Sequence, residues 1–222
     1  MQYVSTRGAA PTLDFADALL VGLASDGGLY VPKSWPQIPD GGRGDYVETA
    51  VEVMSPFVEG SIDQDAFAQM VSDAYSVFDA DDVAPLVDLG DGLHLMELFH
   101  GPTLAFKDIA LQLVGRLFDY ELTSRGERVT IVGATSGDTG SAAIEACRDR
   151  RNVDIVILHP AGRVTEVQRR QMTTVQSTNV HNVAIDGTFD DCQDMVKAMF
   201  ADEPFRARMN LSAVNSINWA RV

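Results

Sequence analysis

Hydrophobic positions follow a helical spacing in the first part of the chain, up to about residue 92. The spacing i, i+3, i+4, i+7 and i+10 is clearest in five apolar residues: Phe67, Met70, Val71, Ala74 and Val77. It predicts helices over residues 46–57 and 62–78, and a further apolar-rich helical stretch over 13–23. A short extended piece at 29–32 ends in a proline and leads into a loop rich in Pro and Gly at 35–44. We therefore expect a largely helical N-terminal region.

From residue 93 onward, short apolar runs alternate with helical stretches. Strands are expected at 93–99, 128–133, 153–158, 180–185 and 211–214, and helices at 109–122, 139–148, 166–175 and 190–200. The run 153–158 is continuously apolar, which is typical of a strand buried on both faces. The alternation predicts an α/β fold, with a mainly parallel twisted sheet, flanking helices and right-handed crossovers. We place a domain boundary between residues 92 and 93, giving regions 1–92 and 93–222.

The amino-acid composition and net charge limit the classes of molecule that the protein can be expected to bind. The 222 residues are 45% hydrophobic and 22% charged, as in a globular protein rather than a disordered one. The net charge of −15 repels phosphate backbones, so we expect no nucleic-acid partner. An anionic small molecule would need a local site of backbone N–H groups or paired cations. No apolar run approaches the ~20 residues of a membrane span and no apolar signal segment is present, which favours a cytoplasmic protein.

The residue types that bind metals are scattered. Cys147 and Cys192 fit no metal spacing or disulfide framework, and we interpret both as core residues or reduced thiols. The four histidines are isolated and are interpreted as structural: His94, His100, His159 and His181. We therefore expect no metal site. The aspartates between residues 63 and 91 are interpreted as a solvated face.

The first segment that could carry chemistry runs from His100 to Asp108, between a predicted strand and a predicted helix. Gly101-Pro102 makes a turn, Ala105-Phe106 gives an apolar wall, and Lys107 stands near the helix start. A helix N-terminus and apolar neighbours both favour the neutral amine, which is the form that makes a Schiff base. The alternative is a surface lysine whose stem packs on Phe106.

The second segment, residues 133–141, also joins a predicted strand to a predicted helix. Its small residues let a ligand approach the backbone, and the N–H groups of a helix start can bind an anion. Thr135, Ser136 and Thr139 add hydroxyls, whereas Asp138 adds a negative charge. The segment matches neither GxGxxG nor a phosphate-binding P-loop. The alternative is an ordinary turn in which Asp138 or Ser136 caps the helix.

The third segment lies at the end of the chain. Asn215, Ser216 and Arg221 can all donate hydrogen bonds to phosphate, although a polar loop entering a helix would look the same. The chain stops there without a helix stop, a polar tail or Gly and Pro punctuation. We therefore expect it to be the N-terminal portion of a longer protein.

Taken together, these segments resemble the threonine synthases, which are pyridoxal-phosphate enzymes of fold type II, the tryptophan-synthase-β type. The resemblance covers nearly all of the chain and is carried by the opening residues 3–8, the segment 26–32, the lysine motif 99–108, the loop 134–140 and residues 215–221. The lysine motif and the loop are the specific ones. The resemblance implies that O-phospho-L-homoserine and water are converted to L-threonine and phosphate.

The resemblance also implies roles for single residues. Lys107 would hold pyridoxal 5'-phosphate covalently beside Phe106, and its freed amine would move protons at Cα and Cβ of the substrate. Five residues would hold the substrate phosphate: Thr135, Thr139, Asn215, Ser216 and Arg221. Ser136, Gly137 and Asp138 would lie against the substrate carboxylate and the cofactor ring oxygen. Many relatives carry Asn where Asp138 stands.

One departure from the family pattern is an absence. The Gly- and Asn-rich loop that binds the cofactor phosphate in this fold type has no equivalent before Val222, nor does the hydroxyl that faces the pyridine nitrogen. We therefore expect the isolated chain to bind the cofactor weakly. Two other functions stay open: another phospho-amino-acid lyase of the same fold, and a non-catalytic anion-binding module. The sequence leaves monomer and homodimer equally open.

Overall fold

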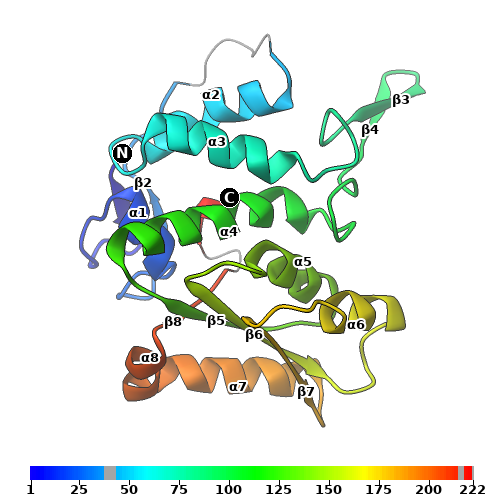
Figure 1. Ribbon diagram of the computed structural model, residues 1–222. Coiled ribbons are helices and arrows are strands. Elements are labelled where there is room, and N and C mark those ends of the chain that lie inside the picture. Colours follow the sequence, from blue (N-terminus) through cyan, green and yellow to red (C-terminus); the bar gives the residue numbers. More distant parts are fainter. Residues whose placement is uncertain (38–43, 215–217, 222) are drawn as a thin grey trace. The chain divides into compact units, whose positions relative to one another are not determined.

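The computed structural model describes residues 1–37, 44–214 and 218–221, which divide into two compact units (Figure 1). The first unit comprises residues 1–113 and 216–222, and the second comprises residues 114–215. The two units are described separately below. The domain boundary expected after residue 92 stays a prediction.

Three helices in the first unit begin at aspartates. They are α1 (Phe15–Val21), α2 (Tyr46–Val58) and α3 (Gln64–Tyr75). The carboxylates of Asp14, Asp45 and Asp63 accept backbone N–H groups of the first turns, which have no partner inside the helix. Part of the acidic excess of the chain is therefore used locally, to begin helices.

The two ends of the chain share the core of the first unit. Strand β1 (Tyr3–Ser5) pairs antiparallel with β2 (Tyr30–Pro32). The Tyr3 ring is fully buried, 6.2 Å from the ring of Trp219 in the 3-10 turn η1 (Trp219–Arg221). Beside that turn, buried Asn218 donates its amide to the carbonyl of Leu19 at 2.6 Å. These contacts join segments that lie about two hundred residues apart in the sequence.

A hairpin of the first unit exposes apolar side chains on both of its strands. Strand β3 (Leu86–Gly90) pairs antiparallel with β4 (Leu93–Met96), and every residue of both strands is exposed. Leu86 and Leu93 expose 68% and 62% of their surface. The predicted strand at 93–99 is confirmed only as far as Met96.

Helix α4 (Lys107–Arg125) carries the chain from the first unit into the second. Within the second unit it packs closely on α5 (Asp138–Cys147): a Cβ on Gly115 would lie only 2.3 Å from the carbonyl oxygen of Ala146. Glycine is therefore required at residue 115, because a side chain would push the two helix backbones apart.

The second unit is built on a parallel sheet in the order β7-β6-β5-β8. Its strands are β5 (Val129–Ala134), β6 (Val153–Pro160), β7 (Val180–Ile185) and β8 (Leu211–Ser212). The chain adds β6 and then β7 on one side of β5, and returns with β8 to the other side. The strand order thus reverses beside β5, and in open α/β sheets ligands bind at the carboxyl ends of the strands at such a point.

Helices cover both faces of this sheet (Figure 1). One face packs against α7 (Phe189–Ala201), with Val132, Leu158 and buried Cys192 in the core. The other face carries α5 and α6 (Glu166–Thr173), and α8 (Glu203–Met209) follows α7. Cys147 and Cys192 are both buried and free, as predicted. Burial raises the pKa of the Cys147 thiol to about 12, which keeps it unreactive at neutral pH.

The predicted α/β fold is confirmed, and each predicted helix and strand of the second unit is present, with small differences at the ends. Among the described strands and α-helices, β1, β3 and α8 were missed. β1 and β3 are short strands that pair antiparallel outside the parallel sheet, and α8 follows α7 after a single residue, Asp202, which caps it. No helix among the described residues is long and apolar enough to cross a membrane.

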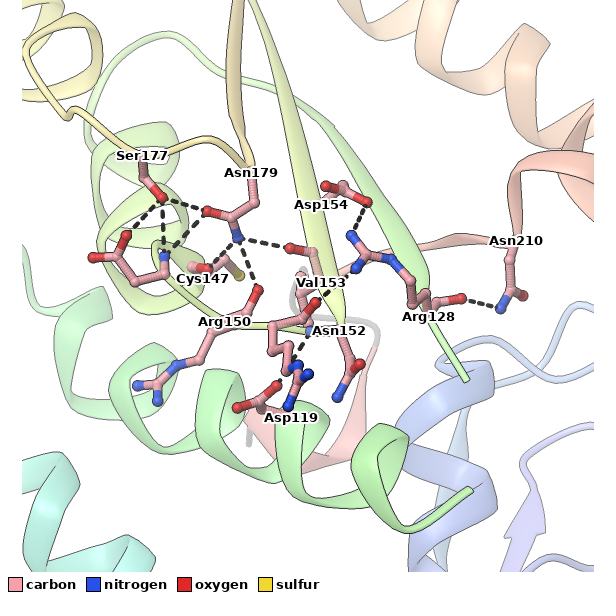
Figure 2. A network of polar contacts seen from close by, with 12 residues as sticks. Asp119, Arg128, Cys147, Arg150, Asn152, Val153, Asp154, Ser177, Asn179 and Asn210 are labelled. Atoms are coloured by element: carbon pink, nitrogen blue, oxygen red, sulfur yellow. Dashed lines mark hydrogen bonds and ion pairs between the residues drawn. The ribbon is translucent and has the colours of Figure 1, made fainter. Parts of the chain in front are cut away.

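Buried Asn179, the residue directly before β7, connects the start of this strand to neighbouring elements by hydrogen bonds. Figure 2 shows Asn179 donating its amide to three carbonyl oxygens, those of Cys147 at 2.9 Å, Arg150 at 3.2 Å and Val153 at 2.6 Å. Its own oxygen accepts the N–H of Asp149 at 3.1 Å. One side chain thus holds the end of α5, the turn after it and the start of β6.

Replacing this side chain should unfold the unit more easily. We expect Asn179→Ala to lower the free energy of unfolding by about 2–4 kcal/mol, because several buried backbone groups lose their partner. The matched control is Asn152→Ala, which removes an exposed bond to Thr123 and should cost about 0.5 kcal/mol. Urea denaturation measures both values, and equal losses in the two variants would contradict the assigned role of Asn179.

Candidate active site

Lys107 is the first residue of α4 and is half-buried. Its amine lies over the ring of Phe106, 4.3 Å from the ring centroid, while Phe106 itself is 57% exposed. Ala105 is buried. The predicted apolar neighbours are therefore present, and the amine contacts the ring face as cations do. A surface lysine whose stem packs on Phe106, which is the alternative interpretation, would make the same contact.

Asp108 is a residue that the sequence analysis did not single out. It is completely buried, and its carboxylate accepts the backbone N–H of Thr103 at 2.8 Å and the Thr103 hydroxyl at 2.7 Å. A Cβ on Gly101 would lie 2.5 Å from the Asp108 Cβ, so the loop can close only with glycine there. Burial raises the pKa of the Asp108 carboxyl. One buried carboxylate thus fixes the loop that leads to Lys107.

His100 at the start of this loop is paired. Its Nε2 lies 2.7 Å from an oxygen of Glu97, and its ring lies 4.7 Å from that of Phe99. His159 has a different setting. It is buried at the end of β6, and its Nδ1 has no partner among the residues that the structure describes.

The turn after β5 stands at the carboxyl end of the sheet, beside the point where the strand order reverses. It leads directly into α5, whose first residue is Asp138. Gly137 has a φ of +153°, a conformation that side chains rarely adopt. A Cβ on Gly140 would lie 2.5 Å from Cγ2 of Thr135 and 2.8 Å from the sulfur of Met172. Glycine is therefore required at residue 137 by the backbone conformation and at residue 140 by the lack of room for a side chain.

Thr135 holds this turn together. Its buried hydroxyl oxygen accepts the N–H of Gly137 at 3.0 Å and the N–H of Gly140 at 2.9 Å. The capping expected from Asp138 or Ser136 is thus carried mainly by Thr135, and the N-cap residue, Gly137, contributes no side chain. An Asp138 oxygen accepts the N–H of the next residue, Thr139, at 2.9 Å.

The structure distributes the predicted residues over the two units. Lys107 and Phe106 belong to the first, and the turn from Thr135 to Thr139 belongs to the second. Asn215 and Ser216 lie outside the described residues. Arg221 ends η1. The structure brings together the members of the turn, while the assembly of all these residues into one site remains a proposal. No group of three or more metal-ligating side chains is found in the described parts of the chain.

Two family models match the chain. The one described as "Threonine synthase N terminus" matches residues 2–75, and the one described as "Pyridoxal-phosphate dependent enzyme" matches residues 79–221. Threonine synthase from Pseudomonas aeruginosa is 60% identical over 100% of this chain and 48% of its own length. The Schizosaccharomyces pombe enzyme is 46% identical over 100% of this chain and 46% of its own length.

Solved structures agree with this result. The chain superposes on PLP-bound threonine synthase from Brucella melitensis with a TM-score of 0.96 at 57% identity, covering 100% of this chain and 49% of that one. For threonine synthase from yeast the TM-score is 0.90 at 44% identity, with 99% and 47% covered. The chain thus spans about half the length of the curated relatives and structures that it matches.

The buried carboxyl of Asp108 should make stability depend on pH. Because its pKa is raised above the ordinary 3.8, the folded chain binds more protons there than the unfolded chain in the window between the two values. Its contribution is fully present below pH 3.8 and falls as pH rises through the raised pKa. We expect wild type to lose unfolding free energy relative to Asp108→Asn over that window in urea titrations.

The control variant, Glu166→Gln, should show the opposite sign. Hydrogen bonds from Arg169 and Arg170 lower the pKa of Glu166 to about 2. Its contribution is therefore present above the ordinary 4.5 and is lost as pH falls toward 2. Slopes of the same sign for the two variants would contradict the burial argument for Asp108.

Proposed function

The chain belongs to the family of pyridoxal-phosphate dependent enzymes, and from this membership we propose that it is the N-terminal part of a threonine synthase. The reaction is the conversion of O-phospho-L-homoserine and water to L-threonine and phosphate, in the cytoplasm. One observation carries the proposal: the match to the Pseudomonas aeruginosa enzyme, at 60% identity, covers the whole chain and so spans both the lysine motif and the turn after β5.

The residues present fit pyridoxal phosphate. A primary amine stands at the first position of α4 beside an aromatic ring, as an aldehyde-binding lysine requires. The turn after β5 offers hydroxyls and a helix start, with two glycines at points where a Cβ has no room. When bound, the cofactor supplies an electron sink that eases the loss of protons from the substrate carbons. Lys107 would hold it, with Phe106 and Asp138 as neighbours.

The proposed work of Lys107 is proton transfer. The Lys107 amine would remove and return protons at Cα and Cβ of the substrate. Asp108 and Thr103 support this role, because their two hydrogen bonds fix the loop that carries the lysine. A fixed loop keeps the amine in one place through successive proton transfers.

The turn after β5 is proposed to bind the anionic groups of the substrate. Thr135 and Thr139 would bind the phosphate together with Asn215, Ser216 and Arg221, while Ser136, Gly137 and Asp138 would lie along the carboxylate. The Thr135 oxygen accepts two N–H groups, and no described residue accepts its own proton, which supports donation to a ligand oxygen. Neutral donors of this kind suit an anion bound by a chain of net charge −15.

Replacing the lysine tests the proposal. We expect Lys107→Ala to lower phosphate release from O-phospho-L-homoserine by the native gene product by at least ~10³-fold, since both anchor and base are lost. Lys197→Ala, which removes an exposed lysine paired with Asp194, should leave the rate unchanged. Borohydride reduction followed by peptide mapping should find the cofactor on Lys107. Release from O-phosphoserine alone would instead support another lyase of this fold.

The 222-residue chain by itself should bind the cofactor poorly. Its relatives are about twice as long, and the family's cofactor-phosphate loop has no equivalent before Val222. We expect the purified chain, mixed with an equal amount of pyridoxal phosphate and passed through a desalting column, to retain well under half of it. A stoichiometric visible absorption band on the purified chain would refute this expectation.

A further inference from the structure

A glutamine from α6 covers the turn after β5. A Cβ built on Gly137 would lie 2.2 Å from Oε1, 2.4 Å from Cδ and 2.7 Å from Nε2 of Gln168. The whole amide therefore lies against the Cα of Gly137, and Gly137 is buried although the neighbouring Ser136 is exposed. Because Gln168 and the turn belong to the same compact unit, this contact is a fixed part of that unit.

The orientation of Gln168 follows from the start of its helix. Thr165 caps α6, and its oxygen accepts the N–H of Gln168 at 3.4 Å. The same hydroxyl donates to Oε1 of Gln168 at 2.8 Å. The acceptor end of the amide is thus engaged, while the two protons of Nε2 meet no acceptor among the described residues. An unused donor therefore lies beside a turn whose hydroxyls and helix start suit an anion.

The charged side chains next to Gln168 on α6 are paired with each other, so the Gln168 amide is the donor considered at this turn. Arg169 and Arg170 both bind Glu166, so their charges are paired on the same helix. Met172, another residue of α6 that meets the turn, is buried and has its sulfur close to Gly140. Of the two α6 residues that lie against the glycines of the turn, Gln168 carries the stronger hydrogen-bond donor.

We propose that Gln168 is a specificity-determining residue, whose Nε2 donates to an anionic oxygen of the molecule bound at the turn from Thr135 to Gly140. The proposal rests on the proposed function and deepens it by naming an additional substrate contact. The oxygen belongs to a phosphate or to a carboxylate. A neutral amide suits either, whereas a carboxylate at residue 168 would repel both.

The test compares one added charge at two adjacent positions of α6 in the native gene product. Gln168→Glu places a carboxylate against Gly137, and Val167→Glu places the same charge at a side chain that is 70% exposed. We expect Gln168→Glu to raise KM for O-phospho-L-homoserine by about 10-fold or more, with kcat within about 3-fold, because ground-state binding is lost. Val167→Glu should change KM by less than about 2-fold.

A neutral variant separates the donor from the charge. Gln168→Met keeps the length of the side chain and removes Nε2 together with Oε1, the exposed acceptor of the Thr165 hydroxyl, so we expect KM to rise by about 3–10-fold, the value of one lost hydrogen bond to an anion. Thermal unfolding midpoints of all three variants should match wild type, because residue 168 is only half-buried. Unchanged KM in both Gln168 variants would overturn the proposal.

Calorimetric binding gives a readout that does not need turnover. Inorganic phosphate and L-homoserine are titrated separately into wild type, Gln168→Glu and Val167→Glu. Weaker phosphate binding in Gln168→Glu alone assigns the phosphate, and weaker homoserine binding in that variant alone assigns the carboxylate. Equal binding of both probes in all three proteins would overturn the proposal. If wild type binds phosphate but releases none from O-phospho-L-homoserine, the proposed function fails while Gln168 is still tested.

Discussion

The turn after β5 depends on one buried hydroxyl. Backbone N–H groups at the start of α5 need partners, and Thr135 supplies a single oxygen to two of them, those of Gly137 and Gly140. That oxygen fixes where the chain leaves the sheet and where the helix begins. The residues of the turn that are proposed to meet the substrate, and the contact of Gln168 with Gly137, take their places from this arrangement. A methyl group in place of the hydroxyl would leave both N–H groups buried without an acceptor.

The loop before α4 is likewise held by one buried hydrogen-bond acceptor, although the residue is different. There the buried acceptor is the carboxylate of Asp108, which takes the N–H and the hydroxyl of Thr103. In both loops a glycine lies where a Cβ would strike the residues that organise the loop: Gly101 against Asp108, and Gly140 against Thr135. Both segments proposed for chemistry are thus held by buried hydrogen bonds and close backbone contacts. Such fixation lowers the ordering cost when a ligand binds.

The sequence predicted those parts of the fold that local pattern controls. Alternating apolar runs and helical stretches located the strands and helices of the second unit, and small residues after a strand located the turn. The position of β8 beside β5, which creates the reversal of strand order, could not be predicted, because it depends on pairing across about eighty residues. The contact of Gln168 with Gly137 also joins residues that are distant in the sequence and was missed, and so was the burial of Asp108, although its partner Thr103 is only five residues away. A carboxylate and an amide on helices are usually solvated, and only the three-dimensional structure shows that these two are packed against the backbone of a loop or turn.

The acidic composition of the chain is compatible with the proposed anionic substrate, because many of the carboxylates are engaged in local caps and ion pairs. Three carboxylates cap the starts of helices: Asp14, Asp45 and Asp63. Glu166 pairs with Arg169 and Arg170 on α6, the helix that flanks the turn. That pairing leaves the turn lined by hydroxyls, glycines and the amide of Gln168, with Asp138 as its acidic member. Neutral donors bind an anion without adding long-range attraction, so recognition there depends on shape and hydrogen-bond direction more than on net charge. A chain of net charge −15 therefore needs its donors placed accurately: Thr135 holds the N–H of Gly137, and Thr165 orients the amide of Gln168 that lies against Gly137.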